Sequence, residues 1–122
     1  MYYGSNKLLG DVVRRAERIK PHKIEAVDEH AKTELDLYLE NTSELYNQKL
    51  SILTNIRRRL DKGTFDVSKV YKLWMYWVDR GARMYVKEFG IPGQKVSDLG
   101  FNKATRTALA RELALTYASG HE

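Results

Sequence analysis

Residues 67–89 constrain the fold more than any other stretch, because they predict one long helix that is apolar around most of its circumference. At 100° per residue, Val70, Trp74, Trp77, Val78 and Tyr85 fall within one apolar arc of about 220°. A helix on a protein surface needs an apolar stripe of only about 100°. The predicted helix must therefore be covered on three sides, either by other helices of its own chain or by a second subunit.

Apolar residues at three- and four-residue spacings predict helices along the rest of the chain. The expected helices span about residues 6–19, 23–40, 43–61, 67–89 and 103–118. Pro21 separates the first two, since the residue before a proline avoids the helical region. A capping-box spacing from Asn41 to Glu44 favours a break there, and one long helix from about 23 to 60 is the alternative. Residues 91–100 predict a loop.

No segment of useful length alternates apolar and polar residues, so we expect no strands. A chain of 122 residues suits one domain and can bury a core without disulfides or metal. The absence of cysteine excludes disulfides, thiolate catalysis and zinc ribbons. We therefore predict an all-α fold, a compact bundle of four to five helices in a single domain. In the helix at 43–61, Leu45, Leu50 and Ile56 are among the residues that we expect in the core.

No stretch carries a catalytic or cofactor motif. The glycines never take the spacing of a phosphate-binding loop, and no serine or histidine lies in a nucleophile motif. His30 and Glu34 stand four residues apart and could share a metal, but no second pair is in register with them. We therefore expect no enzymatic activity, no cofactor, no metal and no small-molecule substrate.

The aromatic residues of the helix at 67–89 support two interpretations. In the first, they form the core of one chain. In the second, part of the arc faces a partner, because Trp, Tyr, Met and Arg are enriched at protein interfaces. Glycine inside a helix is costly, and a close approach by another helix would explain Gly81. The candidate interface residues are Trp74, Trp77, Gly81, Tyr85, Tyr2 and Tyr3.

The narrow polar sector of the same helix is rich in cations. We define the cationic ridge as Lys69, Lys72, Tyr76, Arg80, Arg83 and Lys87. Like charges at helical spacing repel each other, a cost that a phosphate backbone would offset, and Tyr76 can stack on a base or ribose. The alternative is a solvated face whose cations pair with the acidic residues of the helix at 23–40.

Two arginine clusters add to the positive charge. They comprise Arg14, Arg15 and Arg18 near the N-terminus, and Arg57, Arg58 and Arg59 in the third helix. Each cluster alone is typical of a helix end, whereas together with the cationic ridge they would form a phosphate-binding surface. The net charge of +5 favours an acidic partner.

These patterns lead to two hypotheses. The first is a non-enzymatic assembly or adaptor protein that contacts a protein partner, or copies of itself, through helix faces. In type, such a short, basic, cysteine-free helical chain resembles structural or accessory products of phages and mobile elements. The second is a nucleic-acid-binding protein that uses the cationic ridge and the arginine clusters. With no signal peptide or membrane span in the sequence, we expect a cytoplasmic location, with association with a virion as an alternative.

Overall fold

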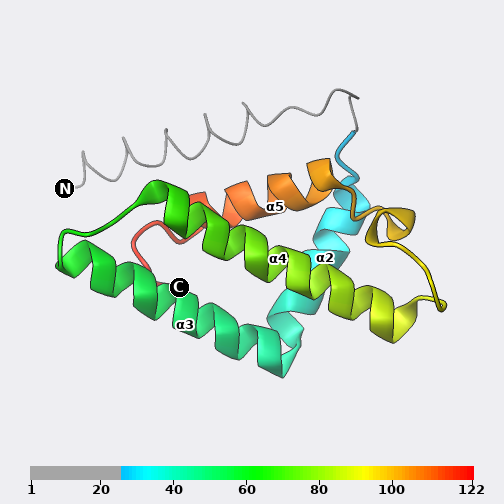
Figure 1. Ribbon diagram of the computed structural model, residues 1–122, viewed down its shortest axis with the longest axis horizontal. Coiled ribbons are helices and arrows are strands. Elements are labelled where there is room, and N and C mark those ends of the chain that lie inside the picture. Colours follow the sequence, from blue (N-terminus) through cyan, green and yellow to red (C-terminus); the bar gives the residue numbers. More distant parts are fainter. Residues whose placement is uncertain (1–25) are drawn as a thin grey trace.

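The computed structural model describes residues 26–122, and these residues form an all-helical bundle without strands (Figure 1). Within them, the elements follow in the order α2 (Glu29–Asn41), α3 (Ser43–Asp61), α4 (Val67–Phe89), the short 3-10 helix η1 (Val96–Leu99) and α5 (Lys103–Thr116). The helix α4 lies at the centre and contacts every other element. The all-α prediction is therefore confirmed.

Part of the sequence prediction lies outside the described residues. This applies to the expected helix at 6–19, to residues 23–25 of the expected second helix, and to the candidate residues Tyr2, Tyr3, Arg14, Arg15 and Arg18. Within residues 26–122, no helix combines the length and the apolar character that a membrane-spanning segment needs.

Most helix bounds agree with the predicted ones. The helices α3 and α4 match them, and α5 begins at Lys103 as predicted but ends at Thr116. The helix α2 begins at Glu29, later than expected, because the Asp28 side chain caps it by accepting a hydrogen bond from the Ala31 amide at 3.0 Å. The predicted loop at 91–100 contains η1, and Gly100 directly after it has a left-handed backbone (φ 88°).

The predicted break between α2 and α3 is confirmed, but its capping differs from the expected one. Thr42 has an extended backbone and makes no side-chain cap to α3. Its hydroxyl instead donates to the carbonyl of Tyr38, at 2.6 Å. The capping box expected from Asn41 to Glu44 is therefore wrong, and the side chain at the break bonds to the helix that ends there.

The apolar arc of α4 is buried within this chain. Trp74, Trp77 and Val78 are completely inaccessible to solvent. The indole N–H of Trp77 donates to the carbonyl of Leu45 on α3 at 2.7 Å, and the two indole rings pack edge to face with centroids 5.6 Å apart. Neighbouring helices of the same molecule thus cover the wide arc, as the first interpretation of the aromatic residues expects.

Gly81 marks the place where α2 crosses α4. A Cβ atom on Gly81 would clash with Cδ2 of Leu39 and would lie 3.7 Å from Cδ1 of Leu35. Both leucines are fully buried on α2, so neither side chain can turn toward solvent. The close helix approach predicted from Gly81 is confirmed, and the approaching helix is α2.

We expect Gly81→Ala to lower the free energy of unfolding by about 1–3 kcal/mol, because overpacking outweighs the better helix propensity of alanine. In a Leu39→Ala background the same change should be neutral or stabilising, since the truncated side chain leaves room for the new methyl group. Urea unfolding of the wild type, both single variants and the double variant measures this coupling. Additive effects would contradict the crossing at Gly81.

Candidate functional site

The cationic ridge lies on the exposed side of α4. Lys69, Lys72, Arg83 and Lys87 are exposed, and the Tyr76 side chain is 67% exposed. Between the first and last of these residues the helix rises about 27 Å. The packing of α4 against α2, α3 and α5 fixes the backbone from which these side chains project.

The acidic residues of α4 form their contacts with other helices. Asp79 accepts a hydrogen bond from Arg106 of α5 at 2.7 Å. Glu88 accepts one from the hydroxyl of Tyr38 on α2 at 2.9 Å. The acids of α4 are therefore engaged by its neighbours instead of by its own cations.

Arg80 differs from the other cations of the ridge. Its guanidinium lies 3.2 Å from the carboxylate of Glu44 and donates to Gln48 at 2.6 Å, both on α3. The expected pairing of the ridge with the acidic second helix is thus wrong for Arg80. Within residues 26–122, no ion pair involves Lys69, Lys72, Arg83 or Lys87.

The acids of α2 have partners away from the ridge. Glu29 binds Lys32, Glu40 binds Lys49 on α3, and Glu34 accepts from the hydroxyl of Tyr85. Among the described residues, the acidic helix thus leaves most of the ridge's positive charge unneutralised.

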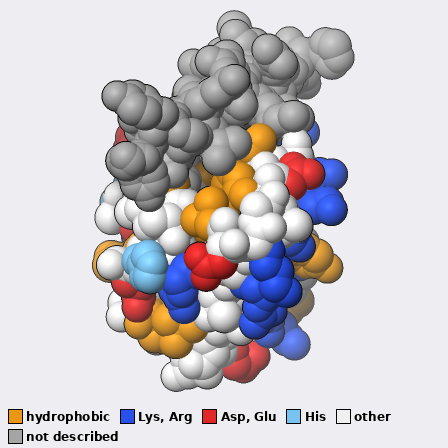
Figure 2. Space-filling view, turned by 90° about the vertical axis from the view of Figure 1, so that its left-hand side faces the viewer, with side chains coloured by type: hydrophobic (Ala, Val, Ile, Leu, Met, Phe, Trp, Pro, Cys, Tyr) orange, Lys and Arg blue, Asp and Glu red, His pale blue; other side chains and the backbone are white. Residues whose placement is uncertain are grey.

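The arginine cluster at 57–59 is divided between different roles. Arg57 donates to the carbonyl of Gly120 and so holds the segment after α5 against α3. Arg59 donates to Asn55 at 2.6 Å, and Arg58 is exposed. Figure 2, which faces the end of the molecule where α3 ends and α4 begins, shows lysine and arginine side chains gathered along one side of this end.

Burial corrects the interface hypothesis for the centre of α4. Trp74, Trp77 and Gly81 are buried among the helices of one chain and present no surface to a partner. Tyr85 is partly buried, and its hydroxyl donates to Glu34 at 3.0 Å. The arc was wide because three neighbouring helices cover it, and a second subunit is not needed to explain it.

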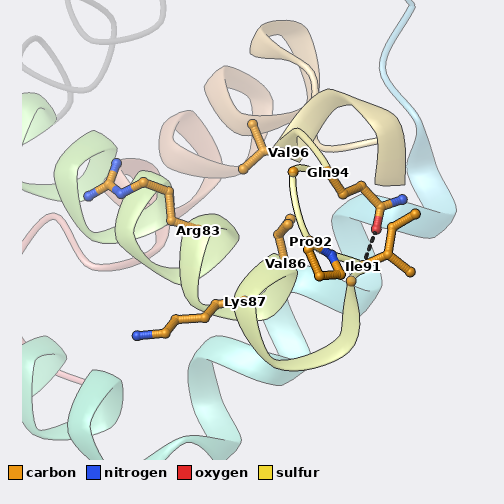
Figure 3. A pocket seen from close by; sticks show the side chains of 9 residues that line it. Arg83, Val86, Lys87, Ile91, Pro92, Gln94 and Val96 are labelled. Atoms are coloured by element: carbon orange, nitrogen blue, oxygen red, sulfur yellow. Dashed lines mark hydrogen bonds between the residues drawn. The ribbon is translucent and has the colours of Figure 1, made fainter.

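An open hollow of about 400 Å³ lies where the cationic ridge ends, between the last turns of α4 and residues 90–96. In Figure 3 the charged ends of Arg83 and Lys87 both point away from this loop. Val86, Ile91 and Pro92 contribute apolar surface, and the Gln94 side chain accepts from the Ile91 amide at 3.0 Å. The described lining contains no carboxylate or imidazole, so it suits contact better than proton transfer.

The histidine and glutamate predicted to face each other on α2 do so. His30 Nε2 lies 2.8 Å from Glu34 Oε1. Within residues 26–122, however, no three side chains of the metal-binding types come together to hold a metal ion. The pair is thus an exposed helix-surface contact.

Lys49 is the notable polar residue that the sequence analysis missed. Its side chain is almost fully buried, and Nζ donates to both carboxylate oxygens of Glu40, at 2.9 and 2.8 Å, and to the hydroxyl of Tyr117 at 2.9 Å. A carboxylate oxygen of Glu122 is 3.3 Å away. Burial lowers the pKa of Lys49, but the hydrogen bonds to Glu40 and Tyr117 outweigh burial and raise the pKa above its ordinary value.

A helical projection would have revealed Lys49. It lies about 40° from Leu45 around the helix, inside the apolar face, whereas Leu50 lies about 140° away. Leu50 was expected in the core and is 39% exposed, so that expectation is wrong. The signal was a lysine in the middle of an apolar face.

These observations define an all-helical protein whose central helix presents a cationic face. Comparison with protein-family models, with curated proteins and with solved structures finds no match to this chain.

We expect Lys49→Met to lower the free energy of unfolding at pH 7 by about 1–3 kcal/mol, because charged hydrogen bonds are lost. Since folding raises the pKa of Lys49, its contribution is complete below the unfolded pKa of about 10.4 and decreases as the pH rises above that value. In urea unfolding, the stability difference between wild type and variant should therefore stay constant up to about pH 10 and narrow as the pH rises beyond the unfolded pKa toward the higher pKa of the folded protein. Lys62→Met, at an exposed lysine, is the control, and a difference that widens with pH would contradict this role.

Proposed function

We propose that this protein binds nucleic acid along the cationic ridge. The observation that supports this most directly is that four exposed cations share one face of α4 and have no carboxylate partner among residues 26–122. Clustered like charges repel each other, and a phosphate backbone offsets that cost by releasing its condensed counterions.

The arrangement of the cations favours a polymer over a small anion. Lys69 and Lys87 lie about 27 Å apart along the helix, so the ridge cannot converge on a single phosphate. Along one strand of a duplex, phosphates follow at about 3.4 Å of axial rise, and the ridge is thus long enough to pass about eight of them. A polyanion can contact at once all four cations that lack a carboxylate partner in the described part of the chain.

Charge reversal tests this proposal. We expect Lys72→Glu combined with Arg83→Glu to weaken binding of an oligonucleotide and to reduce the slope of log K against log salt by about 2, or about 1 for each lost phosphate contact. Both residues are exposed, so the fold should be retained. Fluorescence anisotropy between ~50 and ~200 mM salt measures the slope.

The matched control is Lys103→Glu, which reverses an exposed lysine on α5 outside the ridge. It should leave the slope closer to that of the wild type. Absence of binding at ~50 mM salt, or a slope that the double variant leaves unchanged, would exclude the ridge as a nucleic-acid site.

A second candidate function is self-association through the apolar end of α4. Phe89 and Ile91 are 61% and 71% exposed, only two positions apart in the chain, and Ile91 also lines the hollow. Neighbouring exposed apolar residues favour a protein contact. This is the assembly hypothesis in the form that remains once Trp74 and Trp77 are known to be buried.

If this second function is correct, the wild-type protein should exceed the monomer mass in light scattering at high concentration. Phe89→Ser combined with Ile91→Ser should restore the monomer, because the apolar contact area is lost. Leu37→Ser, at a similarly exposed leucine on α2, is the control and should not. A monomeric wild type at high concentration would rule out the self-association.

A further inference from the structure

Tyr76 is an exposed aromatic residue in the middle of the cationic ridge. Its side chain is 67% exposed, and the aromatic contacts within residues 26–122 are made by other rings. On a helical projection, Lys72, Tyr76 and Arg83 lie within about 40° of one another. One cation lies about 6 Å before the ring along the helix axis and the other about 10 Å after it.

The packing of α4 prevents it from entering the major groove of a duplex. The groove is about 12 Å wide, and a helix with its side chains is about 10–12 Å in diameter, so a helix can enter the groove only where it projects beyond the elements that pack beside it. In contrast, α4 is packed against α2, α3 and α5 (Figure 1), and the residues of its apolar arc are buried. A duplex could therefore offer only its phosphates to the ridge, and its stacked bases would stay out of reach of Tyr76.

A single strand offers both features that this surface can recognise. Its bases are free to leave the stack and lie on the Tyr76 ring, while its phosphates contact Lys72 and Arg83 on either side. Arg80, the cation nearest to Tyr76 in the C-terminal direction, is already held by Glu44 and Gln48. The two cations that flank the ring, Lys72 and Arg83, thus have no acid partner among residues 26–122.

We infer that the cationic ridge takes single-stranded nucleic acid, with one base stacked on Tyr76 and the adjoining phosphates on Lys72 and Arg83. This inference rests on the proposed function and names the class of polymer that the site prefers. Stacking on an aromatic ring tolerates any base, so the preference is for an open strand and not for a sequence.

The test compares three probes of one sequence, each about 20 nucleotides long: single-stranded DNA, single-stranded RNA and duplex DNA. Anisotropy at ~0.1 M salt should show tighter binding of the wild type to a single strand than to the duplex. Tyr76→Ala should weaken single-strand binding by about 5- to 100-fold and leave duplex binding unchanged. Tyr76→Phe should retain the wild-type affinity because the ring is preserved.

The control is Phe89→Ala, which removes another exposed aromatic ring of α4 that lies off the ridge. It should leave single-strand binding unchanged, and comparison of the DNA and RNA strands then identifies the preferred polymer. Duplex binding as tight as single-strand binding, or single-strand binding unaffected by Tyr76→Ala, overturns the inference and leaves the proposed function standing. Absence of binding to all three probes overturns the proposed function itself.

Discussion

The burial of the apolar arc of α4 is the constraint on which the rest of the structure depends. Trp74 and Trp77 are sealed between helices, and Gly81 allows the leucines of α2 to approach the backbone of α4 closely. The helices α2, α3 and α5 must all pack against this arc to bury it, and this requirement determines where they lie around α4. Fully burying large aromatic side chains also contributes a major part of the apolar stabilisation of a small bundle.

The same burial determines what α4 can present to other molecules. Its polar sector is narrow, so the cations gather in a line along the helix, and the neighbouring helices engage the acids Asp79 and Glu88. Packing thus leaves the cationic ridge exposed, with the ring of Tyr76 near its middle. Core and surface are two consequences of one distribution of residues around a single helix.

Much of the fold could be predicted from the spacing of apolar residues and from the positions of proline and glycine. The bounds of α3 and α4 follow from apolar periodicity and helix propensity, which are properties of neighbouring residues. The cost of a glycine inside a helix was the signal for the close approach at Gly81. The interface role of Trp74 and Trp77 was wrong, since an apolar arc does not reveal whether the same chain covers it. The partners of Arg80 and Lys49 could not be predicted from the sequence either, because they depend on how separate helices pack together.

The placement of the two tryptophans, the only ones in the chain, has a practical consequence for spectroscopy. Both indoles are shielded from water, and both lie in the buried arc of α4 and outside the cationic ridge. Their emission should therefore shift toward the red when the chain unfolds and stay nearly constant when a ligand binds the cationic ridge. Intrinsic fluorescence therefore reports on whether this protein is folded, and measuring binding at the cationic ridge requires an added fluorescent label.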